Sequence, residues 1–446
     1  MKKLLLLLTF AALIFAATHI WRKPKLKTYS GYNVVVILID ALRASNLGSY
    51  GYQRDTSPFM DELARKGVRF ERAYSQESYT MASVPSIFGS IYPVQHKVLY
   101  KNPGIDTLAD EVLTLPEILQ AKGYNTAGFV FNPHLNAAFK FNQGFDYYDD
   151  NPEGFQGATP ALKYETAQKI YDKTMTWLNK RPDQTKPFML YLHYRDVHSP
   201  YLAPKPYQDM YCAGAKNKFE LSLCRYDGEI RYTDDKLKVL VSELEARWPN
   251  TIFVICSDHG EQFKEHGSKG HTTSLYQEEI WVPLIVYIPN QDISESITAR
   301  VENTDIAPTI LDLLGESLPE VFEGISLVAA ANNETDLKDR VIVSGGAKER
   351  MALIHGDYKY YKHRGLTRIE TMRRAEEHRQ LPFVEELYNL KDDPAEKNNI
   401  AAHHPRELAF FRGVYEKLMA KAGSLQGKSV ELDKETAERL KSLGYM

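Results

Sequence analysis

The sequence predicts an α/β protein whose mainly parallel sheet is covered by helices on both faces. Residues 33–40 and 251–258 are almost continuously apolar and rich in β-branched side chains, which is typical of strands buried on both faces. Strand patterns of this kind alternate along the chain with helical patterns, and that alternation favours a parallel sheet between helical layers. A length of 446 residues, 43% of them hydrophobic, is enough to build a sizeable core.

The remaining elements follow in chain order. The first buried strand leads into a helix over residues 57–66, where Thr56 or Ser57 serves as N-cap and Pro58 takes the first helical position. Another helix is capped by Thr114 and stopped by Gly123. We then expect strands at 126–130, 188–193, 251–258 and 282–288, a long amphipathic helix at 227–247 and a helix at 306–314.

The character of the chain changes after residue 327. Residues 329–339 are small and polar and are interpreted as a linker. Short strand signals follow at 341–344, 352–355 and 358–362, then a basic stretch at 364–379 that we interpret as a solvated loop or helix, and finally a pair of helices. We therefore predict a main domain over residues 30–330 and a smaller α+β subdomain over residues 331–446.

The first 28 residues carry the pattern of an export signal. Lys2 and Lys3 precede an apolar run from Leu4 to about Trp21, and basic residues follow it. A buried first helix is the alternative, but five consecutive leucines so close to the terminus are unusual for a core helix. The run of 18 apolar residues (4 to 21) is also about the length that crosses a bilayer. We expect export to the periplasm or cell envelope, with cleavage or retention as a membrane anchor both open.

Charge and cysteine content limit the function classes. There are 55 Lys and Arg residues against 58 Asp and Glu, so the chain lacks the basic excess of a nucleic-acid-binding protein, and a small or polar ligand is expected. The three cysteines are too few for a disulfide scaffold and too far apart for a metal knuckle. Cys256 is expected to be an inert core residue, whereas Cys212 and Cys224 could pair in an oxidising compartment.

Two of the buried strands end in aspartate, which points to a metal site. Asp40 ends the first strand, Asp258 ends the strand at 251–258, and His259 follows directly. In a doubly wound sheet the ligand-binding groups gather at the carboxyl ends of the strands. A single such Asp is as readily a helix N-cap, but two of them with an adjacent histidine favour one divalent ion: manganese, zinc, magnesium or calcium.

Two further segments carry candidate catalytic groups. The stretch from Ser257 to Thr272 interleaves His259, His266 and His271 with glycines, so it is predicted to be a loop fixed to a strand end. A plain solvated loop is the alternative. The segment 78–93 is interpreted as a turn followed by a helix with Pro85 near its start, and Ser83 is then a hydroxyl at the head of a helix, where the dipole favours anionic esters.

Together these segments resemble the sulfatases of the alkaline phosphatase superfamily. The similarity extends over nearly the whole exported chain and ends at Leu443-Gly-Tyr445. Its motifs are Ile39-Asp40-Ala-Leu-Arg43, Leu47-Gly-Ser-Tyr-Gly51, Gly67-Val-Arg-Phe70, Ser83-Val-Pro-Ser86 with Tyr92-Pro93, Gln143-Gly-Phe-Asp146, His193-Tyr-Arg-Asp-Val-His198, Ser257-Asp-His-Gly260, Val282-Pro-Leu-Ile285, Asp305-Ile-Ala-Pro-Thr309 and Glu386-Leu-Tyr-Asn-Leu390.

The resemblance implies an alkaline-phosphatase-like fold and a role for each site residue. Asp40, Asp258 and His259 look like metal ligands, and Ser83 stands where the family carries its nucleophile, a Cys or Ser converted to formylglycine. His198 looks like the histidine that meets the ester. His271 falls near a substrate-binding lysine of many members and is expected to act as general acid. His266, in the same loop, is expected to bind substrate.

Three positions depart from the family pattern. Ile87 replaces the Arg of the formylglycine signal, Ala41 replaces a second Asp, and Trp281 replaces an Arg. The departures make formylglycine doubtful and widen the expected substrates from sulfate esters to phosphate esters of small molecules, glycans or lipids. The expected function is a metal-dependent hydrolase of such esters. The alternatives are a membrane-associated transferase of phosphate-linked head groups and, less favoured, a catalytically inactive binding homologue.

Overall fold

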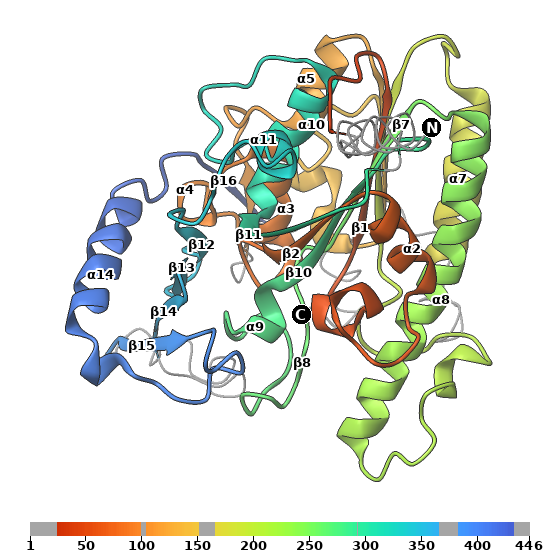
Figure 1. Cartoon of the computed structure of the whole chain (residues 1–446). Coiled ribbons are helices and arrows are strands. Elements are labelled where there is room, and N and C mark those ends of the chain that lie inside the picture. Colours follow the sequence, from red (N-terminus) through yellow and green to blue (C-terminus); the bar gives the residue numbers. More distant parts are fainter. Residues whose placement is uncertain (1–24, 100–103, 151–165, 292, 365–381, 432–446) are drawn as a thin grey trace, which may run out of the picture.

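The computed structural model describes residues 25–99, 104–150, 166–291, 293–364 and 382–431. Its centre is an eight-stranded sheet in the order β11-β2-β10-β7-β1-β6-β4-β5 (Figure 1). The strands are β1 (Asn33–Ile39), β2 (Val68–Tyr74), β4 (Asn125–Val130), β5 (Tyr147–Asp149), β6 (Phe188–Tyr194), β7 (Thr251–Cys256), β10 (Trp281–Tyr287) and β11 (Glu295–Glu302).

The sheet is mainly parallel, as predicted, with β10 running antiparallel to both of its neighbours. The connection from β7 to β10 explains that direction. It contains only the short helix α9 (Gln277–Ile280) and a small hairpin of β8 (Gln262–Phe263) and β9 (Lys269–Gly270). Because a parallel return needs a crossover across a face of the sheet, a chain that stays at one edge must run back antiparallel.

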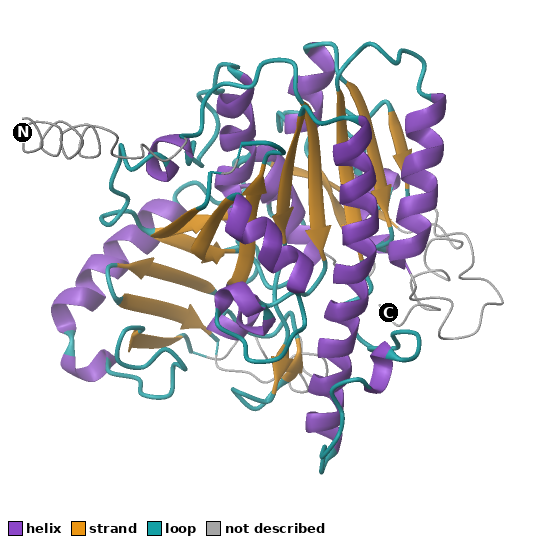
Figure 2. Cartoon of the chain, turned by 45° about the vertical axis from the view of Figure 1, so that its right-hand side comes forward, coloured by secondary structure: helices purple, strands orange, loops and turns teal. Residues whose placement is uncertain are grey.

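Helices cover both faces of this sheet (Figure 2). Along β1, Val34, Val36 and Leu38 pack in one core and the residues between them pack in the other, since successive strand side chains point to opposite faces. The first core is closed by α3 (Thr80–Gly89), α5 (Leu115–Ala121), α10 (Ile306–Leu314) and α11 (Val328–Ala331). The second core is closed by α2 (Pro58–Lys66), α7 (Thr166–Lys180) and α8 (Lys218–Arg247).

The C-terminal subdomain is a second, antiparallel sheet. It contains β12 (Ile342–Gly345), β13 (Met351–His355), β14 (Tyr358–His363) and β15 (Val384–Asn389). One face packs against α14 (Pro405–Met419) and α4 (Pro93–His96), and the other face packs against Tyr74, Leu275 and Ile280 of the main domain. This second contact brings the subdomain against the segment that follows His271.

The chain then returns to the main domain. Strand β16 (Gln426–Glu431) pairs with β3 (Gly104–Leu108), a pairing that the predicted boundary at residue 330 did not include. Most of the basic stretch 364–379 and the second helix of the expected C-terminal pair lie outside the described residues. So do residues 1–24 of the expected export signal. In the described part of the chain, no helix is long and apolar enough to cross a membrane.

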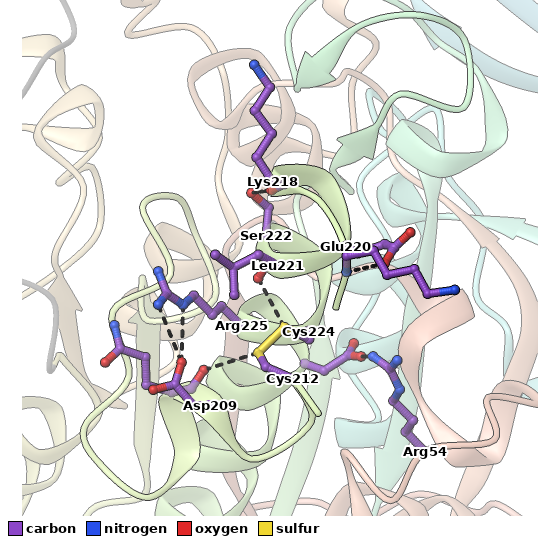
Figure 3. Close-up of a disulfide and its surroundings, with 12 residues drawn as sticks. Arg54, Asp209, Cys212, Lys218, Glu220, Leu221, Ser222, Cys224 and Arg225 are labelled. Atoms are coloured by element: carbon purple, nitrogen blue, oxygen red, sulfur yellow. Dashed lines mark hydrogen bonds and ion pairs between the residues drawn. A yellow bond between two sulfur atoms is a disulfide. The ribbon is translucent and has the colours of Figure 1, made fainter. Parts of the chain in front are cut away.

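The long helix α8 begins earlier than the sequence predicted, at Lys218 rather than residue 227. The Asn217 side chain caps it by accepting hydrogen bonds from the backbone N–H groups of Phe219 and Glu220. The added turns carry Cys224, which forms a disulfide with Cys212 (Figure 3). The pairing expected in an oxidising compartment is therefore confirmed, and Cys256 is the buried free thiol that the sequence indicated.

Candidate active site

Residues from several strands meet at the carboxyl edge of the main sheet. Strands β1 and β7 are adjacent and pair Leu38 with Cys256, so Asp40 and Asp258, each two residues further on, emerge at the same level. Both side chains are fully buried, as is His259. The prediction that two strand-terminal aspartates share one site is consistent with this register.

Asp40, Asp258 and His259 form a group that fits a metal ion. One ligand atom from each lies within 4.8 Å of the others, and His259 Nε2 is 3.5 Å from Asp40 Oδ1 and 3.6 Å from Asp258 Oδ2. Neither of those two carboxylate oxygens accepts a hydrogen bond from the described residues. Buried anionic oxygens without donors are costly, and a divalent cation is the partner that this donor set accommodates.

The groups around Asp40, Asp258 and His259 affect the charge of these candidate ligands and fix their orientation. Burial, and then repulsion from Asp258, raises the pKa of Asp40. His259 Nδ1 donates to the carbonyl oxygen of Gly260 at 2.8 Å, so the lone pair of Nε2 faces the space between the two carboxylates, where a cation would bind. Ala41 adopts a positive φ of 61°, and its N–H donates to Asp258 Oδ1 at 3.3 Å.

Thr80 places a hydroxyl beside the metal-ligand group. It is the first residue of α3, and its Oγ1 lies 3.4 Å from His259 Nε2. Asn132 donates both to Thr80 Oγ1, at 3.2 Å, and to Asp40 Oδ2, at 3.0 Å. The Thr80 hydroxyl therefore lies next to His259 and is linked to Asp40 through Asn132. It also lies at the N-terminus of a helix, where backbone N–H groups favour an anion.

Ser83, the nucleophile that the resemblance implied, is engaged elsewhere. It is the fourth residue of α3 and fully buried, and its hydroxyl donates to the backbone carbonyl oxygen of Asp258 at 2.7 Å. That bond ties α3 to the end of β7. The helix begins at Thr80, three residues before Ser83, so Thr80 and not Ser83 is the hydroxyl at the head of the helix.

His198 and His271 lie together next to the metal-ligand group. The ring centroid of His271 is 4.3 Å from that of His259 and 4.9 Å from that of His198. Glu261 is fully buried and lies 3.2 Å from His271 Nδ1; burial alone would lower the pKa of His271, but this carboxylate raises it. Burial lowers the pKa of His198 well below its usual value. The two histidines thus favour opposite protonation states.

His266, expected to bind substrate, is a structural residue in this arrangement. Its Nδ1 is 2.6 Å from Glu278 Oε1, and its Nε2 is 3.1 Å from the carbonyl oxygen of Glu396. Both partners are acceptors, so both ring nitrogens donate and the ring is an imidazolium. The ring also stacks on Tyr276 with centroids 3.7 Å apart. His266 therefore fastens the loop to the C-terminal subdomain.

This assignment predicts a pH-dependent contribution to stability. Burial alone would lower the pKa of His266, but the bond to Glu278 raises it, so the folded state favours the proton. The stabilisation is fully present below about pH 6.5, the usual His value, and is lost as the pH rises through the raised pKa. We expect His266→Gln to cost about 1–3 kcal/mol at pH 6 and progressively less at alkaline pH.

Thermal unfolding of the wild type and His266→Gln across this pH range is the measurement. The exposed His403 provides the control, since His403→Gln should leave the unfolding temperature nearly unchanged at every pH. A stability difference that stays constant or grows with pH would contradict the charged pair.

Five residues at this edge were not singled out from the sequence: Thr80, Asn132, His134, His193 and Arg195. Asn132 follows the buried strand β4, which is the same signal that identified Asp40 and Asp258. His193 Nε2 lies 3.7 Å from Asp40 Oδ2, and burial lowers the pKa of His193 to about 4. Burial lowers the pKa of His134 to about 4, and the charges of Arg195 and His271 contribute in the same direction, so these groups lie near one another.

Comparison with known proteins identifies relatives that match most of the chain. The family model described as Sulfatase matches residues 32–316, and the model described as N-sulphoglucosamine sulphohydrolase, C-terminal, matches residues 265–421. The ulvan-active sulfatase of Formosa agariphila is 28% identical over 370 residues, 74% of this chain and 72% of its own. The N-acetylgalactosamine-6-O-sulfatase of Bacteroides thetaiotaomicron is 24% identical and covers 92% of this chain and 98% of its own.

A solved structure supports the fold. The phosphonate monoester hydrolase of Agrobacterium radiobacter superposes with a TM-score of 0.70 at 18% identity, covering 87% of this chain and 95% of that one. At this identity the match establishes the shared architecture. It confirms the predicted sheet between helical layers with a smaller C-terminal sheet.

Proposed function

The chain belongs to the sulfatase family of ester hydrolases, and we propose that it cleaves phosphate or sulfate esters with the unmodified hydroxyl of Thr80 as nucleophile. The observation that supports this most directly is the position of Thr80 Oγ1 beside His259 and Asn132, at the head of α3 and next to Asp40. In this proposal Asp40, Asp258 and His259 hold the metal, and His198 and His271 act on the ester, as the resemblance implied.

Asp40, Asp258 and His259 would hold the divalent ion. Bound there, such an ion favours the deprotonated hydroxyl of the nucleophile and offsets charge on the ester oxygens. Asn132 orients Thr80 by donating a hydrogen bond to Oγ1, which engages one lone pair of that oxygen and leaves the other for attack. His271, kept protonated by Glu261, is placed to give a proton to the leaving oxygen.

A threonine nucleophile favours phosphate over sulfate as the transferred group. Formylglycine arises from the CH₂ group of a Cys or Ser, and oxidation of threonine gives a ketone instead of an aldehyde hydrate. Release of the transferred group must then depend on attack by water or another acceptor on a threonine ester. We therefore expect phosphate esters to be turned over at least as well as aryl sulfates.

The natural substrate is proposed to be a small or glycan-linked ester. The relatives named for ulvan and for N-acetylgalactosamine-6-O-sulfate support a sugar-borne ester, and the phosphonate monoester hydrolase supports phosphorus chemistry on this fold. Export is proposed with it, because the Cys212–Cys224 disulfide is typical of an oxidising compartment and the first residues have the pattern of an export signal.

The test is a substrate screen of the purified, metal-loaded protein. We expect turnover of 4-nitrophenyl phosphate or bis(4-nitrophenyl) phosphate at a rate equal to or above that of 4-nitrophenyl sulfate. Product analysis with and without an acceptor alcohol separates hydrolysis from transfer of the phosphate-linked group. Turnover of the sulfate alone would contradict the preference for phosphate, and turnover of none of the three would contradict the proposed chemistry.

A further inference from the structure

The C-terminal subdomain presents one lysine to the edge of the active site. Lys348 is exposed and lies in the turn between β12 and β13. Its ammonium is 4.3 Å from the ring centroid of Tyr79 and 3.4 Å from the carbonyl oxygen of Thr272. Tyr79 directly precedes Thr80 in the chain, and Thr272 directly follows His271. The ammonium thus contacts the chain neighbours of both proposed reacting residues, Thr80 and His271.

Hydrogen bonds to two separate segments, one before Thr80 and one after His271, fix the position of the turn that carries Lys348. Arg350 donates to Glu77 Oε2 and Ser78 Oγ, each at 2.8 Å, and to the carbonyl oxygen of Thr272 at 2.7 Å. The N–H of Gly345 donates to the carbonyl oxygen of Gln76. These contacts attach the turn to the segment before Thr80 and to the segment after His271, so Lys348 has a defined position although its side chain is exposed.

Among the described residues, no carboxylate forms an ion pair with Lys348. The nearby acidic groups are used by others: Glu77 pairs with Arg350 at 2.8 Å and Glu349 pairs with Arg364 at 2.7 Å. Glu279 accepts hydrogen bonds from Ser274. The ammonium of Lys348 therefore has no carboxylate partner within the described chain and is available to an anionic ligand.

The charge of Lys348 has the smallest effect of the three charges that lower the pKa of His134, after those of Arg195 and His271. His134 follows Asn132, the residue that holds Thr80 and Asp40. In the reaction proposed above, the metal-ligand group, Thr80 and His271 act on the reacting ester, and the charge of Lys348 remains for another group of the same substrate.

We propose that Lys348 forms an anion subsite beside the reacting centre, so that the preferred substrate carries a second negative group, such as a carboxylate or another acid ester, on its leaving-group side. This proposal rests on the ester hydrolysis proposed above. The second charge would meet Lys348 between Tyr79 and Thr272, while the reacting group meets Thr80 and His271. The C-terminal subdomain then contributes directly to substrate selection.

The test uses two substrates that differ in one charge. These are 4-(2-carboxyethyl)phenyl phosphate and the corresponding uncharged carboxamide, whose leaving groups are otherwise alike. We expect the wild type to prefer the carboxylate by about fivefold in kcat/KM, mainly through KM, as for a partly solvated ion pair. Lys348→Ala should remove that preference and leave the carboxamide rate nearly unchanged, and Lys348→Glu should reverse it. Added salt should reduce the wild-type preference.

Lys391→Ala is the control, because Lys391 is an exposed lysine of the same subdomain and its loss should preserve the preference. Equal turnover of the two substrates by the wild type, or an equal loss for both in Lys348→Ala, would overturn the subsite. Binding of the two matching aryl phosphonates, which cannot be hydrolysed, is measured by calorimetry on the metal-loaded protein. If neither phosphate is hydrolysed, the proposed function fails, and the phosphonate pair still decides whether Lys348 selects the second charge.

Discussion

Asp258→Asn is expected to abolish both the divalent metal and the ester hydrolysis while the protein stays folded. Asp258 Oδ2, like Asp40 Oδ1, is a buried carboxylate oxygen that accepts no hydrogen bond within the described part of the chain, and it lies 3.6 Å from His259 Nε2. The amide keeps the shape of the side chain but removes the charge that a divalent ion requires. Metal content of the purified variant and its turnover of the best ester substrate are the measurements.

Thermal unfolding provides a readout that does not depend on turnover. Because an ion that binds only the folded state stabilises it, a chelator should lower the unfolding temperature of the wild type and have little effect on Asp258→Asn. Asp234 is the matched control: it is also fully buried, but it caps α2 by accepting from the N–H groups of Phe59 and Met60. Asp234→Asn should lose stability and keep its metal. A full metal content in Asp258→Asn would exclude the site.

Thr80→Ala is expected to lower kcat by roughly 10⁴- to 10⁶-fold, the cost of removing a nucleophile or its essential partner in other hydrolases. The metal ligands Asp40, Asp258 and His259 remain, so metal binding should persist. Thr80→Ser restores a hydroxyl at the same atom position and should recover most of the activity. Together the three proteins separate loss of the nucleophile from loss of the metal.

Ser83→Ala is the matched control for the same helix. Its hydroxyl bonds to the carbonyl oxygen of Asp258, so the variant leaves a buried acceptor unsatisfied and should lose about 1–3 kcal/mol of stability. We expect its turnover to stay far above that of Thr80→Ala. Mass spectrometry of the peptide 73–97 after a substrate quench should place a covalent adduct on Thr80. An aldehyde or an adduct at Ser83 would contradict the assignment and restore the formylglycine chemistry.

Several features could be predicted without tertiary structure because they depend on local patterns. Apolar runs with β-branched residues located β1 and β7, and the aspartates at their ends followed from the rule that parallel strands present ligands at one edge. The helix at Leu115–Ala121 was predicted from its capping residue, and the structure shows Thr114 and Glu117 bonded reciprocally. Two cysteines near a polar stretch were enough to suggest the disulfide.

Strands with weaker patterns escaped prediction. In β2 and β11, half-exposed and charged residues alternate with apolar ones, so neither has the continuous apolar run of a central strand. Their pairing at the sheet edge depends on long-range contacts between residues more than 200 positions apart. The direction of β10 likewise depends on the path of the preceding loop, which no local pattern encodes.

The choice among polar side chains was decided by the tertiary structure alone. The sequence by itself determined that a metal-ligand group, a hydroxyl on a helix and several histidines meet at one sheet edge. It indicated Ser83 and not Thr80, because a helix start is uncertain by a few residues and three residues turn a side chain through most of a helical turn. It also indicated that both His271 and His266 act on the substrate, the first as general acid and the second in binding. Only the fold places Glu261 against one ring, and Glu278 with the subdomain carbonyl of Glu396 against the other. Those buried partners, distant in the chain, are the reason why we propose a catalytic role for His271 and a structural role for His266.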